Sequence, residues 1–390
     1  MLVLTSLFEI RRVDQLGFSS EIWKEIEVIL KRQNFSTLPH STCDGLPPIA
    51  LLQDRDDPRN TLLVTITKSL LTIDFNETSN DDDVTQHRRR AQEIQIKLES
   101  VLPSCIIKRT CPLQRGRKIW QYSELGDGRI SEDDYTEILF DEKSDYQQVT
   151  IARSDEFGNV LLLDGLENLS ENDNIYTSTL LGLDEGLCFK DKKILILGGG
   201  DGAALYELLK RSPAMVTMVE IDEVVIHACR KHLRGCCGDS MDKYRGENYE
   251  IIIGDCIELL RQYSEEGKKF DYVISDITDI PIEPKTDITS DKTSQVFFSD
   301  VNDSIWVFFK QVYKLCLKVT TNDGYLMTHV GASSNKRAIE NFKRETSKLD
   351  KNLKMNYYHK HIPTFEDRWT FCHIKKNTAQ KMECDIIDSV

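Results

Sequence analysis

Hydrophobic and polar positions divide the chain into three stretches that differ in periodicity. In the first, which ends near residue 110, isoleucines recur at helical spacing after Ser19–Ser20, residues 61–75 alternate as strands do, and residues 88–102 form an amphipathic helix. Residues 80–83 are predicted to be a turn, and Arg88–Arg90 the solvent-exposed start of the second helix. The pattern therefore predicts that residues 1–110 form an α/β domain, and no group of catalytic residues is recognised in it.

The second stretch, residues 111–166, consists of short strand-like runs separated by turn residues. Gly126–Gly128 and Phe157–Asn159 carry the turn signals. The predicted strands are residues 119–123, 135–140, 148–152 and 160–163. This pattern indicates a small β-strand domain, either a meander or a partial barrel.

From about residue 190 the chain repeats a buried strand, a glycine-rich turn and a helix. The expected strands are residues 194–197, 215–219, 249–253, 270–275 and 324–328, and the expected helices are residues 202–211 and 224–232. Such alternation predicts a doubly wound parallel sheet with its ligands at the carboxyl ends of the strands. This domain is expected over residues 167–376, followed by a disordered polar tail at 377–390.

The charge of the chain is strongly acidic and unevenly placed. There are 64 Asp and Glu residues against 50 Lys and Arg, a formal net charge of −14. Residues 153–186 contain eight acids and one base, and residues 271–303 eight acids and two bases, so the two windows carry −7 and −6. A nucleic-acid partner is disfavoured because it needs a basic surface. The balance favours a cationic ligand or simple solubility.

Compartment signals in the sequence are few. No stretch approaches the roughly 20 apolar residues of a membrane span, and the first residues lack the features of a signal peptide. The chain has eleven cysteines and no C-x-x-C pair. An odd count without a secretion signal predicts reduced thiols in a cytoplasmic protein. No Cys/His spacing typical of a metal site is present, so no metal site is predicted.

A glycine-rich turn follows the first strand of the predicted parallel sheet. Gly198, Gly200 and Ala203 fit the dinucleotide fingerprint G-x-G-x-x-A, but Asp201 stands between the glycines and the helix. Its carboxylate would repel a pyrophosphate by about 4 kcal/mol at ~4 Å and an effective dielectric constant of ~20. The turn therefore favours a positively charged ligand that is not a phosphate. The alternative is a tight turn in which Asp201 only caps the helix.

Three further acids end the following strands. Glu220 lies 22 positions after Gly198, where an acidic side chain binds ribose hydroxyls in nucleotide-binding sheets. Asp255 ends the third strand, where it can accept a hydrogen bond from an adenine amino group or cap the next helix. Asp276 ends the fourth apolar strand. These acids are expected to meet at one edge of the sheet, and such crowding requires a cation in compensation.

Several runs of the chain resemble the spermidine/spermine synthase family of aminopropyltransferases, and within it the spermine synthases most closely. They are Phe157–Gly165, Asp173–Tyr176, Ile194–Gly202, Met215–Asp222 and Phe270–Asp276. The resemblance covers about residues 135–375 and implies a methyltransferase-like Rossmann catalytic domain. It also implies that residues 1–110 resemble S-adenosylmethionine decarboxylase and form a homodimer.

The resemblance implies the transfer of an aminopropyl group from decarboxylated S-adenosylmethionine to spermidine, giving spermine and methylthioadenosine without a metal or redox cofactor. Asp276 would be the general base, and Asp201 would hold ammonium groups of the substrates. The implied contacts to the nucleoside are Gln147, Gly198, Gly200, Glu220, Asp255 and Cys256. The implied contacts to the polyamine are Asp173, Tyr176, Asp201, Phe365 and Asp367.

Some positions leave the acceptor amine open. Asp367, two residues before Trp369, resembles the acid of spermine synthases that binds the distal amine. In contrast, Phe365 replaces a family tyrosine, His329 replaces a glutamine, and Asp279 matches an acid of the spermidine synthases. The alternatives are a spermidine synthase acting on putrescine, a methyltransferase with the same sheet, and a catalytically degenerate dimerising partner.

Overall fold

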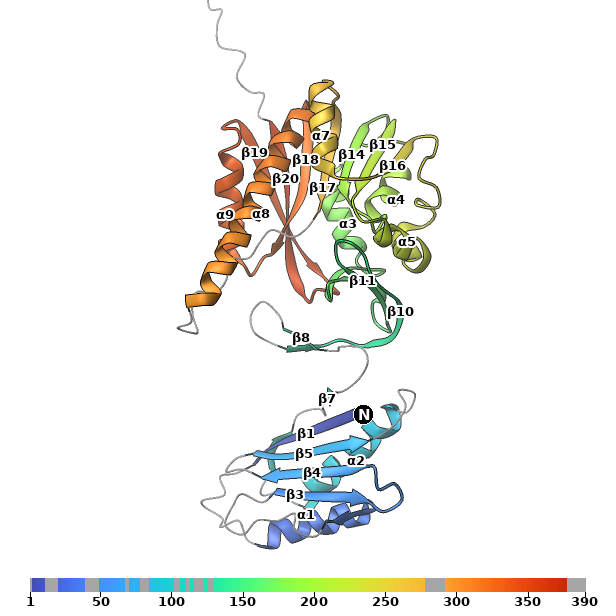
Figure 1. The fold of residues 1–390 in the computed structure, drawn as a ribbon, viewed down its shortest axis with the longest axis vertical. Helices are drawn as coiled ribbons and strands as arrows, with labels where there is room; N and C mark the ends of the chain where they lie inside the picture. The colour runs from blue at the N-terminus through green and yellow to red at the C-terminus, as the bar shows by residue number, and fades with distance from the viewer. Residues whose placement is uncertain are drawn as a thin grey trace, which may run out of the picture. The chain divides into compact units, whose positions relative to one another are not determined.

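The structure is a computed structural model that describes residues 2–10, 20–38, 49–66, 70–77, 84–101, 106–109, 113–115, 122–124, 130–277 and 292–376. The chain forms two compact units, Met1–Trp120 and Gln121–Val390, and Figure 1 shows the fold of each. The first boundary was predicted at residue 110. The predicted turn at 80–83, Asp279 and the predicted tail at 377–390 lie outside the described residues.

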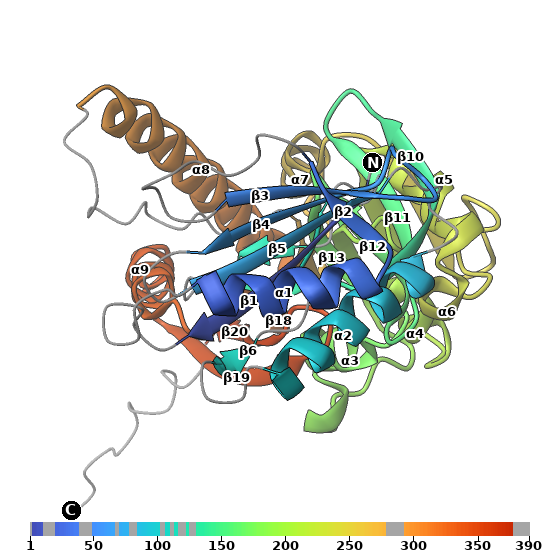
Figure 2. The same cartoon turned by 90° about the horizontal axis from the view of Figure 1, so that it is seen from below.

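An antiparallel sheet forms the framework of the first unit. Its order is β2-β3-β4-β5-β1-β6, with β7 also paired to β1, among the residues described. The strands are β1 (Leu2–Ile10), β2 (Phe35–Thr37), β3 (Ile49–Asp54), β4 (Thr61–Ile66), β5 (Leu70–Glu77), β6 (Ile106–Arg109) and β7 (Leu113–Arg115). Helices α1 (Ser20–Arg32) and α2 (Val84–Val101) lie next to each other along this sheet (Figure 2).

Alternation in the strands explains why the helices cover one face. In β4 every second residue, including Leu62 and Val64, is buried, as expected when one face of a strand packs on helices. Leu30 of α1 and Leu98 of α2 belong to the same apolar core as these strand residues. The α/β domain predicted from the sequence is therefore present, with its own hydrophobic core.

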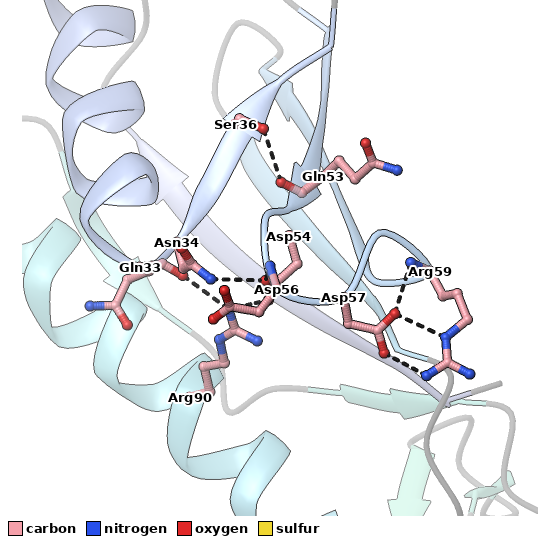
Figure 3. Close-up of polar contacts among 9 residues, drawn as sticks. All are labelled: Gln33, Asn34, Ser36, Gln53, Asp54, Asp56, Asp57, Arg59 and Arg90. Carbon is pink, nitrogen blue, oxygen red and sulfur yellow. Dashed lines mark hydrogen bonds and ion pairs between the residues drawn. The ribbon is translucent and has the colours of Figure 1, made fainter.

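A polar cluster ties α2 to the sheet (Figure 3). Arg90 forms an ion pair with Asp54 at 2.6 Å, and the Asp54 side chain is only 5% exposed. Arg90 also donates to the carbonyl of Gln33 at 2.9 Å, and its guanidinium lies 4.5 Å from the centre of the Phe35 ring. Burial of Asp54 opposes ionisation, but the hydrogen bond from Arg90 lowers the pKa of this carboxyl overall.

The prediction that Arg88–Arg90 form a solvent-exposed helix start is wrong for Arg90. The helix begins earlier, at Val84, so these arginines lie within it. Arg89 is exposed, whereas Arg90 is turned toward Asp54. The charge of a buried carboxylate, which the sequence pattern does not reveal, determines this orientation.

We predict that Arg90→Ala destabilises the first unit by about 1–3 kcal/mol, because it leaves the buried Asp54 carboxylate without its cation. Amide hydrogen exchange of β3 and β4 in the full chain measures the change. Arg89→Ala, at an exposed position of the same helix, is the control and is expected to shift stability by less than about 0.5 kcal/mol. Equal effects of the two substitutions would contradict this account.

The second unit is built on a mixed sheet with the order β16-β15-β14-β17-β18-β20-β19. Neighbouring strands from β16 to β18 pair in parallel. The strands are β14 (Lys193–Gly198), β15 (Met215–Glu220), β16 (Tyr249–Ile253), β17 (Phe270–Asp276), β18 (Thr320–Ala332), β19 (Leu353–Ile362) and β20 (Asp367–Lys376).

Helices cover both faces of this sheet (Figure 1). They are α3 (Asn174–Leu180), α4 (Ala203–Leu209), α5 (Glu223–His232), α6 (Arg234–Cys237), α7 (Cys256–Glu265), α8 (Lys292–Val319) and α9 (Lys336–Ser347), with a short 3₁₀ turn at Leu183–Glu185. Ile194 and Ile196 of β14 pack with α3 to α6, and the alternate residues Leu195 and Leu197 pack with α7 to α9. Burial on both faces explains the continuous apolar run of β14, and the predicted doubly wound α/β fold is confirmed.

The edge of the sheet differs from the fully parallel prediction. β20 pairs antiparallel with both β18 and β19. The turn between β19 and β20 spans only residues 363–366, which is too short for the crossover that parallel strands need. These two strands were not predicted.

The short strands upstream form an antiparallel meander. It consists of β10 (Tyr135–Lys143), β11 (Gln148–Ser154), β12 (Gly158–Leu163) and β13 (Leu166–Ser170), preceded by the hairpin of β8 (Tyr122–Glu124) and β9 (Ile130–Glu132). Val149, Ile151 and Leu161 of this meander belong to the same core as Ile194 and Ile196. The strands predicted as a separate small domain thus share a core with the large sheet.

Candidate active site

The carboxyl ends of the parallel strands bring the predicted acids to one edge of the sheet. β14 lies between β15, which ends at Glu220, and β17, which ends at Asp276. Gly198 is paired with Asp276 across the β14–β17 ladder, and Asp201 follows in the turn before α4. The expected convergence of Asp201, Glu220 and Asp276 thus follows from strand order and register.

Asp201 is a buried carboxyl group that accepts a local hydrogen bond. It is 8% exposed, and its Oδ1 accepts the backbone N–H of Ala203 at 2.8 Å. Burial, and then the charge of Asp276, raise the pKa of Asp201 well above its usual range, and the charge of Glu220 adds to this. The side chain therefore makes the contact expected of a helix cap, but its environment also favours a cation.

Glu220 is held by backbone donors on both oxygens. Gly200 donates its N–H to Oε2 at 3.0 Å, and Asp222 donates its N–H to Oε1 at 2.9 Å. Burial nevertheless raises the pKa of Glu220. A Cβ at Gly200 would lie 2.9 Å from Oε2, so only glycine allows this approach without a shift.

Asp276 receives a hydrogen bond from the hydroxyl of Tyr176 on α3, at 3.0 Å to Oδ1. The ring of Tyr176 is enclosed by three other rings, with centroid distances of 5.1 Å to Phe371 and 6.1 Å to both His329 and Phe365. Nε2 of His329 lies 3.0 Å from the carbonyl oxygen of Ile277. This packing orients the tyrosine, which in turn orients the carboxylate of Asp276.

Gly198 has a structural reason to be glycine. Its φ is +78°, and a Cβ there would lie only 2.0 Å from the backbone oxygen of Asp276. The next residue, Gly199, donates its N–H to that same oxygen at 3.2 Å. The glycine turn thus packs against the end of β17, and the approach of Gly198 to a nucleoside stays a prediction.

Two predicted polyamine contacts are engaged in protein hydrogen bonds. Asp173 is 1% exposed and accepts from the N–H and hydroxyl of Ser170 at 2.9 and 2.7 Å, and from the N–H of Thr364 at 3.3 Å. It therefore fastens the turn that carries Phe365. Asp367 is half-buried and accepts from the hydroxyl of Ser334 at 3.0 Å.

The remaining predicted nucleoside contacts lie in the turn between β10 and β11 and after the end of β16. Gln147 donates through Nε2 to Oδ2 of Asp222 at 3.0 Å. Asp255 is exposed and caps α7 by accepting the N–H of Ile257 at 2.8 Å, as its capping alternative predicts. Burial raises the pKa of the Cys256 thiol to about 12, so this side chain is neutral at physiological pH. Contact of Asp255 and Cys256 with adenine stays a prediction.

Two residues at this edge were missed by the sequence analysis as site residues. Asp222 is buried, and the hydroxyl of Ser144 donates to its Oδ2 at 2.7 Å. The available signal was the run Glu220–Asp222, in which a second acid follows the strand end and precedes a helix. Ser144 carries no comparable signal.

Two features that would suggest other functions are absent from the described residues. They contain no group of three or more His, Cys, Asp or Glu side chains arranged to hold a metal ion. Among them, no helix is both long and apolar enough to cross a membrane.

Comparison with known families matches two consecutive parts of the chain. Residues 173–385 match the spermine/spermidine synthase domain, and residues 122–171 match the spermidine synthase tetramerisation domain. The first match alone covers more than half of the chain. The chain therefore belongs to the spermine/spermidine synthase family.

Relatives of the chain include proteins named polyamine aminopropyltransferase. The protein of Pectobacterium atrosepticum is 38% identical over 149 residues, which cover 38% of this chain and 50% of that protein. The protein of Aeropyrum pernix is 29% identical over 238 residues, which cover 60% of this chain and 68% of that protein. The chain thus spans half the length of the first relative and about two thirds of the second.

Solved structures with a similar fold include two spermidine synthases. The enzyme from Thermotoga maritima has a TM-score of 0.51 at 22% identity, covering 70% of this chain and 82% of its own. A spermidine synthase in complex with the transition-state analogue AdoDATO has a TM-score of 0.52 at 23% identity, covering 70% and 84%. At this identity the likeness extends to the fold, which agrees with the doubly wound sheet.

We predict that Asp201→Asn stabilises the ligand-free protein at pH 8 but not at pH 5. The pKa of Asp201 is raised in the folded state, so the folded protein binds a proton on this carboxyl more tightly than the unfolded protein does. Proton binding therefore stabilises the folded protein at low pH, and this contribution is lost as the pH rises through the folded-state pKa. Asparagine keeps the acceptor for Ala203 and carries no charge. We expect the melting temperature at pH 8 to rise by about 2–6 °C.

The control for this prediction is Asp184→Asn, at a side chain that is 65% exposed. It is expected to leave the difference between pH 5 and pH 8 unchanged. Differential scanning calorimetry at both pH values measures the effect. An Asp201→Asn variant that melts no higher than the parent at pH 8 would show that the charge of this carboxylate does not destabilise the ligand-free protein.

Proposed function

We propose that the protein is an aminopropyltransferase that uses decarboxylated S-adenosylmethionine as donor. The observation that carries this proposal is the pairing of Tyr176 with Asp276 beside the buried Asp201, at the carboxyl edge of a sheet of this family. The family match and the names of the relatives support the reaction class.

In the proposed reaction, an amine nitrogen of the acceptor attacks the methylene carbon bonded to the donor's sulfonium. The new C–N bond forms as the C–S bond breaks, and sulfur keeps the electron pair, leaving neutral methylthioadenosine. The amine attacks only after it loses a proton, which Asp276 accepts as general base. Such proton transfer typically contributes about 10²–10⁴-fold to the rate.

Tyr176 serves this step by position. Its hydroxyl donates to Oδ1 of Asp276 and so limits the rotation of the carboxylate. The enclosed ring holds the hydroxyl in place without further side-chain motion. Restricting the base to one orientation is the kind of positioning that lowers the entropic cost of the reaction.

Charge is the second support for the proposal. The donor carries a sulfonium and an ammonium, and a polyamine carries several ammonium groups. A cation next to Asp201 would lower the raised pKa of this carboxyl and remove its repulsion with Asp276. The acidic windows 153–186 and 271–303 would attract the same cations from solution.

We propose spermidine as the acceptor and spermine as the product. Asp367, close to Phe365 and Trp369 at the turn between β19 and β20, supports this choice as the acid for the distal amine. The second candidate is putrescine, because the two solved structures described above are spermidine synthases and the names of the relatives do not distinguish the acceptors. We further propose that the reaction needs no metal or redox cofactor, and that it takes place in the cytoplasm.

The decisive experiment supplies decarboxylated S-adenosylmethionine with spermidine or with putrescine and identifies the products by mass. We expect spermine and methylthioadenosine from spermidine. Spermidine formed only from putrescine would establish the second candidate, and methyl transfer from S-adenosylmethionine would establish a methyltransferase. The matched variant is Asp276→Asn, which keeps an acceptor for Tyr176 but cannot take the proton, and we expect it to lower kcat by about 10²–10⁴-fold. If neither amine gives a product and no methyl transfer occurs, the enzyme proposal is refuted and the degenerate partner is the remaining candidate.

We also propose a homodimer formed through the first unit. This unit has its own apolar core, and the resemblance of the chain to spermine synthases implies an assembly role for it. The family name of residues 122–171 refers to tetramerisation, so an interface in the other unit is the alternative.

We predict that removal of residues 1–120 converts the dimer to a monomer, as measured by sedimentation velocity over a range of concentrations. The reason is that the deleted unit would supply the main interface. The full chain at the same concentrations is the control. A truncated protein that stays oligomeric would place the interface in residues 121–390, which include the meander.

A further inference from the structure

Asp222 joins the large sheet to the turn between β10 and β11. It is 1% exposed, and its Oδ1 accepts the N–H of Val224 at 3.1 Å as the cap of α5. Its Oδ2 accepts from two side chains of the turn, the hydroxyl of Ser144 at 2.7 Å and Nε2 of Gln147 at 3.0 Å. One carboxylate therefore contacts segments separated by more than seventy residues.

The turn itself is held in one shape by Ser144. Its Oγ accepts the N–H groups of Tyr146 and Gln147, each at 3.1 Å, and its own N–H donates to the carbonyl of Gln147 at 2.9 Å. The backbone that carries Gln147 is thus fixed close to Asp222. Only the side-chain torsions of Gln147 remain to be set.

The carboxylate of Asp222 sets the orientation of the Gln147 amide because it can only accept hydrogen bonds. An ionised carboxylate only accepts hydrogen bonds, so the NH₂ group of Gln147 must face it. The carbonyl oxygen Oε1 then lies on the other side of the amide and is presented as an acceptor. With an amide at position 222 in place of the carboxylate, either orientation of Gln147 would be satisfied.

The same residue also holds Glu220. The backbone N–H of Asp222 donates to Oε1 of Glu220, while Gly200 donates to Oε2. Asp222 thus contacts both Glu220 and Gln147, and it leaves each with acceptor atoms. Two acceptors match the two hydroxyl donors of a ribose diol.

We propose that Asp222 is a positioning residue for the nucleoside half of the donor, acting by holding the Gln147 amide with its oxygen toward the ligand. This inference rests on the proposed function in taking an adenosine derivative as the ligand, and on the contact of Gln147 with the nucleoside that the resemblance implies. Asp222 does not touch the reacting carbon or the amine. It acts on donor affinity, whereas Asp276 acts on the chemical step.

The test compares Asp222→Asn with Asp222→Ser by calorimetric binding of methylthioadenosine and by steady-state kinetics. Asparagine has the size of aspartate but allows the Gln147 amide to take either orientation. Serine can still cap α5 but is too short to contact Gln147. We expect each variant to raise the Kd for methylthioadenosine and the KM for the donor about tenfold. The kcat and the KM for the amine should stay within about threefold, which general damage to the fold would not produce.

A double-mutant cycle with Gln147→Ala tests the proposed route. If Asp222 acts through Gln147, Asp222→Asn combined with Gln147→Ala binds methylthioadenosine no more weakly than Gln147→Ala alone. Additive losses would overturn the inference, as would variants that bind like the parent. If Asp222→Asn does not fold, Asp222→Ser carries the same comparison. A parent protein that neither binds methylthioadenosine nor transfers an aminopropyl group would refute the proposed function instead.

Discussion

Carboxylates that meet at one edge of a parallel sheet repel each other, and the structure around Asp201, Glu220 and Asp276 is arranged to limit that repulsion. Two backbone N–H groups donate hydrogen bonds to the carboxylate of Glu220, and the hydroxyl of Tyr176 donates to that of Asp276. These hydrogen bonds stabilise the negative charges. Asp201 accepts the N–H of Ala203, and the pKa of this carboxyl remains raised by burial and by its neighbours. The remaining imbalance is what a sulfonium or an ammonium group would relieve.

The backbone accommodates this crowding through glycine. Gly198 lets the end of β17 pass so closely that any side chain would meet the backbone of Asp276, and Gly200 lets its own N–H reach Glu220. The fingerprint that resembles a dinucleotide-binding turn therefore reflects contact between protein groups as much as contact with a ligand. That is why the spacing of glycines alone separates nucleotide-binding proteins poorly from others with the same sheet.

Residues before the sheet complete the edge. Gln147 comes from the meander, and Tyr176 comes from the helix that follows it. The meander shares a core with the sheet, so these side chains keep a fixed position relative to β15 and β17. The family matches cover two consecutive segments, and the contact of Gln147 with Asp222 joins the two at this edge of the sheet.

The sequence by itself determined the doubly wound class, most of the strands and the acids at their ends, because buried parallel strands carry continuous apolar runs and end where polar residues begin. It did not predict β19 and β20, which pair antiparallel. A short turn shows that two strands run antiparallel only once both strands have been recognised. The roles of Arg90 and Asp222 were likewise decided by tertiary structure. Each depends on a charged or polar partner distant in the chain, Asp54 and Gln147, and local periodicity contains no information about which buried charge a side chain will meet.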